Sequence, residues 1–443
     1  MRRRDDVHPG RKVPDGGRTS LGNLSAAAPP ANILSKYYPS RPHSTRELAT
    51  RNAAQRLAVA LDPAYRRTVT KSTRRPAPSP PSALIAGRAT ALGTARFAKR
   101  HGSRFAPDYF RSFTPGQVRV SSIGLGTYLG ECTADDDRDY ADTAHLALES
   151  GVSLIDTAVN YRCQRSERSV GLALSRAVRE RTAARDEVVV CTKGGYIPLD
   201  DTPPATREEY QAYVEREYFA TGLARPEDVV AGGHCIAPSF LAAQIARSRA
   251  NLGLETIDVY YVHNPEQQLD AITPAQLAER LRAAFEMLEG QCDSGAIAAY
   301  GCATWNGLRV APGTRGHVSL AELVAIARDV CGDRHHFAAV QLPVNLACTE
   351  AVRLPTQQLG TRTVPVLEAA AELGLAVVAS AALLQGNLAH DLPATVHDAL
   401  PGFASDAQRA IAFVRSLPMV TAALVGTKSA RHLHENLGAA RRG

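Results

Sequence analysis

The chain has 443 residues, more than one average domain needs and enough for a barrel of roughly 250–350 residues with an appendage. The formal charge of +7 is uneven, because residues 1–115 hold 22 of the 51 Lys and Arg but only 6 of the 44 Asp and Glu. The rest is therefore acidic, which argues against a protein that binds nucleic acid over its whole surface. No apolar run reaches the roughly 20 residues of a membrane helix, and no apolar segment of a secretory signal follows Met1.

The N-terminal 82 residues have the composition of a disordered, basic extension. They are rich in Ser, Pro, Ala and Arg, and only Arg46 to Leu61 has a loosely helical apolar pattern. A solvated tail without function is the favoured interpretation, while a tail that tethers the protein to nucleic acid or to a surface remains the alternative. Asp5 and Asp6 argue against an organelle transit peptide. Residues 83–117 are expected to link this tail to a domain at 118–443.

From about Val118 short apolar segments alternate with amphipathic segments of helical length, which is typical of repeated βα units. The predicted strands are Ser122–Gly126, Ser153–Thr157, Val188–Thr192, Ile257–His263, Ala299–Thr304, Ala338–Pro343, Ala376–Ser380 and Thr421–Val425. The predicted helices include Asp139–Ser150, Glu167–Arg181, Ser239–Leu252, Pro274–Ser294, Ser319–Val330, Asp406–Ser416 and Ser429–Ala440. Glycines 151, 253, 295 and 374 follow helices at positions suited to a left-handed cap. Eight strands predict an α/β fold of the (β/α)8 TIM-barrel class rather than a doubly wound sheet.

One connection is longer than the others: an insertion at about 194–236 follows the third strand. It contains Tyr196, Tyr210, Tyr213, Tyr218 and Phe219, so we expect it to be ordered. Long loops in compact domains are usually functional, and this one leaves the barrel directly after Lys193. The sequence therefore favours a lid over the substrate.

The cysteines do not form a recognisable disulfide or metal framework. They are Cys132, Cys163, Cys191, Cys235, Cys292, Cys302, Cys331 and Cys348, with no CxxC pair among them. Small, buried free thiols in a reducing cytoplasm are the expected state, in preference to disulfides or zinc ligands. We expect no metal site, because His335, His336, His432 and His434 have no carboxylate or thiolate at ligand spacing.

Four polar side chains lie at or just past the C-terminal ends of predicted strands. Asp156 and Tyr161 belong to SLIDTAVNY, Lys193 ends EVVVCTK, and His263 ends IDVYYVH. In a barrel these ends open onto one face, where active sites of this fold are built. A cation lowers the pKa of a nearby phenol, so Lys193 beside Tyr161 would assist proton transfer, with Asp156 holding the ammonium and His263 bonding the substrate oxygen. Singly each residue has an ordinary structural explanation, but together they predict an enzyme that moves a proton to or from an oxygen.

From about Val118 to Ala440 the sequence resembles the aldo-keto reductase superfamily. The resemblance rests on IGLGTYLG, GVSLIDTAVNY, SERSVGLAL, VVVCTK, SRANLGLETIDVYYVHNP, SGAIAAYGCATWN, VQLPVN, AALLQGNL and VGTKSARHLHENLGAA, in that order. It implies a catalytic tetrad of Asp156, Tyr161, Lys193 and His263, with Tyr161 as the acid. It also implies that a nicotinamide cofactor binds across the barrel mouth, with NADPH favoured over NADH. The family positions for this cofactor fall on Gly126, Thr127, Thr304, Gln341, Gly426, Lys428, His432, Glu435 and Asn436.

Within this resemblance, Lys428 is expected to contact the 2′-phosphate of NADPH, and Glu435 and Asn436 to reach the adenine. Three positions depart from the family pattern: Thr304 replaces a carboxamide-binding asparagine, Ser380 an aromatic residue that stacks on the nicotinamide, and His432 an arginine or glutamine. The predicted function is NADPH-dependent reduction of an aldehyde or ketone, or the reverse oxidation, on a small-molecule substrate. The alternative is a nucleotide-binding redox sensor or partner-protein subunit with little turnover.

Overall fold

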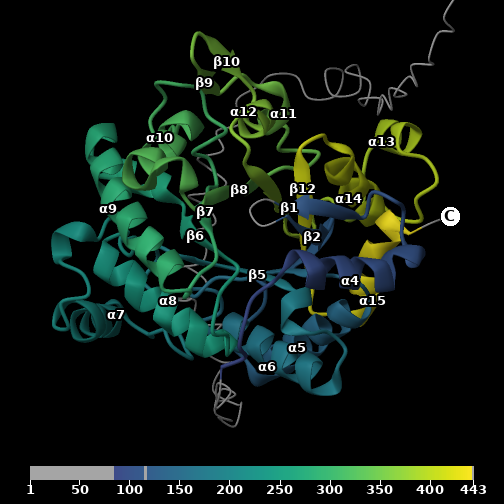
Figure 1. The fold of residues 1–443 in the computed structure, drawn as a ribbon, viewed down its shortest axis with the longest axis horizontal. Coiled ribbons are helices and arrows are strands. Elements are labelled where there is room, and N and C mark those ends of the chain that lie inside the picture. The colour runs from purple at the N-terminus through teal and green to yellow at the C-terminus, as the bar shows by residue number, and fades with distance from the viewer. Residues whose placement is uncertain (1–83, 114–116, 442–443) are drawn as a thin grey trace, which may run out of the picture.

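The computed structural model describes residues 84–113 and 117–441, and its central element is a closed barrel of eight parallel strands (Figure 1). The predicted disorder of residues 1–82 and the helical pattern at 46–61 lie outside the described residues. In chain order the barrel strands are β3 (Ile123–Gly126), β4 (Leu154–Asp156), β5 (Val189–Gly194), β6 (Val259–His263), β7 (Tyr300–Ala303), β8 (Phe337–Pro343), β11 (Ala376–Ser380) and β12 (Val420–Gly426). Each overlaps one predicted strand, so the (β/α)8 fold is confirmed.

Helices surround the barrel on its outer side, as Figure 1 shows. They are α5 (Ala134–Glu149), α6 (Arg165–Glu180), α8 (Pro238–Leu252), α9 (Pro274–Asp293), α10 (Leu320–Cys331), α12 (Val366–Glu372), α14 (Asp406–Ser416) and α15 (Ala430–Leu437). Thr133, Thr273 and Ser319 cap the N-termini of α5, α9 and α10 by accepting a hydrogen bond from a backbone N–H. All four glycines expected to end helices have positive φ, for example 65° at Gly253. Among the described residues, no helix has the length and apolar character needed to span a membrane.

A short antiparallel hairpin closes the N-terminal end of the barrel. It consists of β1 (Phe110–Phe113) and β2 (Val118–Ser121), and neither its pairing nor the helix α4 (Ala91–His101) before it was predicted. Phe113 and Val120 are buried in one cluster with the first residues of the barrel strands, including Leu154 and Val189. The barrel interior is therefore a packed core, and a ligand could reach the barrel only at the C-terminal ends of its strands.

The insertion after β5 packs on the outside of the barrel. Its helix α7 (Arg207–Val214) continues into a π-helical turn at Glu215–Phe219, and the ring of Tyr218 lies 5.4 Å from that of Phe240 in α8. Arg280 of α9 donates hydrogen bonds to the backbone oxygens of Glu227 and Asp228. Figure 1 shows α7 at the outer edge of the molecule, farther from the barrel than α8. The predicted lid is therefore wrong for most of this segment, because Tyr218 packs it against α8 and Tyr213 hydrogen bonds to Pro198 within the insertion.

The remaining elements lie in the connections that follow β8 and β11. They are α11 (Glu350–Arg353), the hairpin of β9 (Gln357–Leu359) and β10 (Arg362–Val364), and α13 (Ala394–Ala399). None of them was predicted, since each is shorter than the periodic patterns that indicate an element in a single sequence.

Candidate active site

The parallel register of the barrel brings the ends of β4, β5 and β6 to one mouth. Asp156 is the last residue of β4, His263 is the last of β6, and Lys193 is one residue from the end of β5. Tyr161 follows in the turn after β4, which then passes through three left-handed residues, 162–164, with φ of 48°, 53° and 70° before α6 begins. The structure thus brings all four predicted residues to the same end of the barrel.

Lys193 is the centre of this group. Its Nζ lies 2.5 Å from Asp156 Oδ1, donates to the backbone oxygen of Thr157 at 2.8 Å, and lies 3.3 Å from the Tyr161 hydroxyl. Lys193 is 1% exposed and Asp156 is 4% exposed. A buried ammonium is stable only when its charge is paired and its protons are bonded, and these three oxygens satisfy both needs. The geometry therefore sets one cation directly against one phenol.

The protonation states of the mouth follow from burial and from this cation. Burial raises the pKa of Tyr161 and outweighs the opposing effect of Lys193, so the expected net lowering of this pKa is not found. Burial lowers the pKa of Lys193, but Asp156 and Tyr161 outweigh it and hold that pKa above its ordinary value. The pKa of His263 is lowered well below its ordinary value by burial first, then by Lys193. At neutral pH the site thus contains a protonated phenol, an ammonium and a neutral imidazole.

His263 is held by residues from both ends of the insertion. The Tyr196 ring lies 5.0 Å from the His263 ring, and Asn264 donates to the Tyr196 hydroxyl at 2.8 Å. His234 Nε2 lies 2.7 Å from the backbone oxygen of His263, while Gln268 contacts the other nitrogen of His234 at the same distance. Sequence reasoning did not place His234 or Asn264 here. The position of Asn264 directly after His263 was the available signal, whereas His234 has none.

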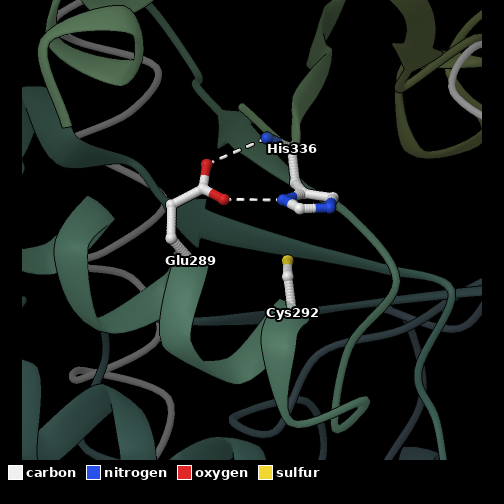
Figure 2. A group of neighbouring side chains, drawn as sticks. All are labelled: Glu289, Cys292 and His336. Carbon is white, nitrogen blue, oxygen red and sulfur yellow. Dashed lines mark hydrogen bonds and ion pairs between the residues drawn. The ribbon is translucent and has the colours of Figure 1, made fainter. Parts of the chain in front are cut away.

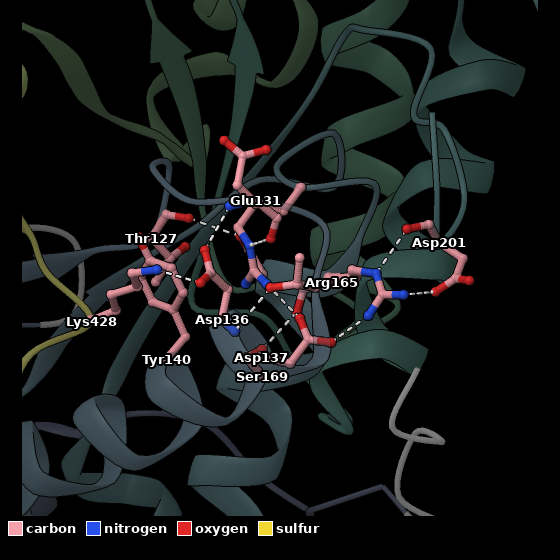
Figure 3. Close-up of polar contacts among 12 residues, drawn as sticks. Thr127, Glu131, Asp136, Asp137, Tyr140, Arg165, Ser169, Asp201 and Lys428 are labelled. Carbon is pink, nitrogen blue, oxygen red and sulfur yellow. Dashed lines mark hydrogen bonds and ion pairs between the residues drawn. The ribbon is translucent and has the colours of Figure 1, made fainter. Parts of the chain in front are cut away.

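A network of arginines and aspartates supports the turn that carries Tyr161 (Figure 3). Arg162 donates to Asp137 Oδ1 at 2.5 Å and to the backbone oxygen of Glu131 at 2.9 Å. Arg165 bonds both Asp137 and Asp201, and Figure 3 shows its guanidinium between these two carboxylates. Since the Arg162 and Arg165 side chains are buried and paired, the turn after Tyr161 is tied to α5 and to the insertion.

Most of the predicted cofactor positions near the tetrad line the same mouth. Gly126 pairs with Gly426 between β3 and β12, and a Cβ on Gly126 would lie 3.6 Å from the Gly426 nitrogen. Gln341 donates to Asp156 Oδ2 at 2.8 Å, and the Thr127 hydroxyl donates to the Asp156 backbone oxygen at 3.2 Å. Thr304 Oγ1 is buried and has no hydrogen-bond partner among the described residues. Bare backbone at a strand end and an unpartnered buried hydroxyl suit a flat, polar ligand such as nicotinamide carboxamide.

The other predicted cofactor positions lie on the connection after β12. Lys428 forms an ion pair with Asp136, the third residue of α5, and Figure 3 shows its ammonium directed at that carboxylate. Asp136 also accepts a hydrogen bond from the Glu131 backbone at 2.6 Å. The remaining three belong to α15: His432 and Glu435, whose side chains reach the surface, and Asn436, which is buried. Lys428 is thus already paired, which sequence reasoning did not foresee.

The opposite end of the barrel contains a second group of polar side chains. Glu289, Cys292 and His336 converge there, with all three ligand atoms within 4.8 Å of one another (Figure 2). The expectation that His336 has no carboxylate or thiolate near it is therefore wrong, because residues 44 or more positions away in the chain fold against it.

All eight cysteines are free thiols, four of them buried.

Comparison with known proteins agrees with this architecture. The family model described as "Aldo/keto reductase family" matches residues 122–391. A D-threo-aldose 1-dehydrogenase from Pseudomonas sp. is 30% identical over 168 residues, which span 38% of this chain and 44% of that relative, so less than half of the relative is matched.

Solved structures are also matched, at low sequence identity. A thermostable aldo-keto reductase bound to the inhibitor epalrestat is 16% identical, with a TM-score of 0.50, and the alignment covers 74% of this chain and 93% of that one. An aldo/keto reductase from Klebsiella pneumoniae, solved with NADP and acetate, is 18% identical with a TM-score of 0.49 over 74% and 89%. Since the family model matches more than half of the sequence, the chain belongs to the aldo/keto reductase family.

Proposed function

We propose that the protein transfers a hydride and a proton between a nicotinamide cofactor and a small carbonyl compound, reducing an aldehyde or ketone to an alcohol or running in reverse. Membership of the family supports this class of reaction. The observation that carries the proposal is the position of the Lys193 ammonium, 2.5 Å from Asp156 and 3.3 Å from the Tyr161 hydroxyl, at the mouth of the barrel.

Tyr161 is the proposed proton donor. Burial keeps the pKa of its phenol above the ordinary value, so it is protonated at neutral pH and can transfer its proton to the carbonyl oxygen as that oxygen becomes an alkoxide. The phenolate that forms is stabilised by Lys193, whose charge Asp156 holds in place. A solvent proton then restores the phenol.

His263 is the proposed binding group for the substrate oxygen. Its lowered pKa keeps the imidazole neutral, so that it donates one hydrogen bond without competing with Tyr161 as an acid. Tyr196 and the backbone contact from His234 limit the movement of the ring. The insertion therefore contributes to the site through its two ends.

The proposed cofactor is NADPH, with NADH less favoured, and when bound its nicotinamide supplies the hydride. Thr304 and Gln341 would bond the carboxamide, and Gly126 with Thr127 would leave space for the ring at the strand end. Lys428, Glu435 and Asn436 would hold the adenosine end. Lys428 would exchange Asp136 for the 2′-phosphate, since Asp136 retains a second hydrogen bond from Glu131.

The test follows NADPH absorbance in purified protein with a panel of aldehydes, ketones and sugars, beside NADP⁺ and NAD⁺ with aldoses and alcohols. Aldoses are included because the matched relative is named for that reaction. Turnover of at least one carbonyl or alcohol class supports the proposal. Tight NADPH binding without turnover over the whole panel would contradict it and favour a nucleotide-binding sensor.

A further inference from the structure

A group of metal-ligating side chains lies at the barrel end opposite the proposed active site. Glu289 and Cys292 belong to the last two turns of α9, and His336 precedes the first residue of β8. Figure 2 shows the carboxylate, the thiol and the imidazole directed at one another from these two segments. The group is thus assembled by the fold and not by neighbouring positions in the sequence.

The geometry of the group is already compact. His336 Nδ1 lies 2.6 Å from Glu289 Oε2, and the His336 backbone N–H donates to Glu289 Oε1 at 2.9 Å. The Tyr300 hydroxyl donates to the same Oε1 at 2.8 Å, which fixes the carboxylate from the β7 side. All three ligand atoms lie within 4.8 Å of one another, so small side-chain rotations would give the spacing of a tetrahedral site.

Cys331, the last residue of α10, is the candidate for a fourth donor. Its thiol lies within electrostatic reach of the Glu289 carboxylate, and its side chain is exposed. Burial, then Glu289, raises the pKa of Cys292, and the same causes raise that of Cys331, so without a cation both thiols stay protonated. A divalent cation could be coordinated by this set of two thiols, one imidazole and one carboxylate.

We propose that Glu289, Cys292, Cys331 and His336 form a structural zinc site. Thiolate and imidazole donors in a tetrahedral set select Zn²⁺ over Mg²⁺ or Ca²⁺, which prefer oxygen ligands. Binding releases one proton from each thiol to solvent. His336 would bind through Nδ1 and carry its remaining proton on Nε2, so the ion takes the place of the Nδ1–Oε2 hydrogen bond.

The site would clamp the N-terminal end of the barrel. It joins the end of α9, the end of α10 and the start of β8. Without an ion, Glu289 links α9 to His336 and Tyr300, and the Arg282–Asp329 ion pair links α9 to α10. Because this end of the fold contributes to stability rather than catalysis, the ion would raise thermal stability without entering the reaction.

The experiment titrates the chelator-treated, fully reduced chain with Co²⁺ and records the thiolate-to-cobalt charge-transfer band, followed by displacement with Zn²⁺. We expect a one-to-one complex, and we expect Cys292→Ser and Cys331→Ser each to remove about half of the band. Each should weaken Zn²⁺ by roughly 100-fold, since even residues that only support metal ligands change affinity by 10- to 100-fold. Cys348→Ser is the matched control and should keep the full band.

Circular dichroism and thermal unfolding distinguish the loss of a zinc ligand from misfolding of a variant. Cys331 is exposed, so Cys331→Ser should fold, and circular dichroism of each variant checks this. Zn²⁺ should raise the thermal midpoint of the parent chain and of Cys348→Ser, but not that of Cys292→Ser or His336→Gln. Absence of the band, or a full band in Cys292→Ser, would overturn the site whatever the outcome of the carbonyl panel.

Discussion

Gln341 donates its side-chain amide to Asp156 at 2.8 Å, across 185 positions of sequence. The other oxygen of the same carboxylate lies 2.5 Å from Lys193. Asp156 is therefore shared between a proposed cofactor residue and the proposed catalytic cation, and its orientation depends on both.

Asp156→Asn should shift the pH dependence of turnover. Burial lowers the pKa of Lys193, and Asp156 is the largest influence that opposes it. Without this charge the pKa of Lys193 falls, so the ammonium is lost at a lower pH and the alkaline limb of kcat/KM moves toward neutrality. Steady-state rates across pH check this. An alkaline limb that stays in place would show that Asp156 does not maintain the Lys193 charge.

Lys428 and Asp136 should change cofactor preference in opposite directions. Lys428→Ala removes the proposed contact to the 2′-phosphate and should weaken NADPH by about 10-fold or more, while NADH changes little. Asp136→Asn keeps an acceptor for the Glu131 N–H but frees Lys428, so NADPH should bind more tightly relative to NADH. Fluorescence titration with both nucleotides measures this. Equal losses for NADPH and NADH in Lys428→Ala would mean that this lysine does not contact the phosphate.

Glu187→Gln should destabilise the protein near neutral pH and have less effect in acid. Its buried carboxylate accepts from Arg96 at 2.8 Å and Arg100 at 2.7 Å, which anchors α4. Burial raises the pKa of Glu187, but these contacts, with the Ala184 N–H, outweigh it and hold the pKa below its ordinary value.

A carboxyl with a depressed folded pKa stabilises the protein above its unfolded pKa, and this stability is lost as pH falls through the folded pKa. Because both arginines are partly exposed, we expect a loss of about 1 kcal/mol at neutral pH. Denaturant unfolding at neutral and acidic pH measures it, with exposed Glu286→Gln as control. A loss of the same size in acid would contradict the assigned cause.

The sequence predicts this fold well wherever a short apolar run has the length of one strand. The barrel strands are short, mostly apolar runs that are almost entirely buried, so the strand ends that carry Asp156, Lys193 and His263 could be placed without coordinates. The hairpin of β1 and β2 was missed because two four-residue strands give too little periodicity. Val118 and Val120, alternating with Arg119, were the available signal.

Contacts between distant segments could not be predicted in the same way. The aromatic residues of the insertion indicated order, but nothing in a single sequence states that Tyr218 packs on Phe240 and not over the mouth. The Lys428 pair with Asp136 spans 292 positions, and the convergence of His336 with Glu289 spans 47. Such pairs depend on the registers of several strands at once, which local patterns do not contain.

The most direct test of the proposed mechanism compares Tyr161→Phe with the parent chain and with Tyr213→Phe, using one substrate from the carbonyl panel. Tyr213 also donates a hydrogen bond, to the Pro198 backbone, but lies on the insertion outside the mouth. Tyr161→Phe should lower kcat by roughly 10²- to 10⁴-fold and leave NADPH affinity nearly unchanged, whereas Tyr213→Phe should keep most activity. Full turnover in Tyr161→Phe would contradict the assignment of Tyr161 as the proton donor.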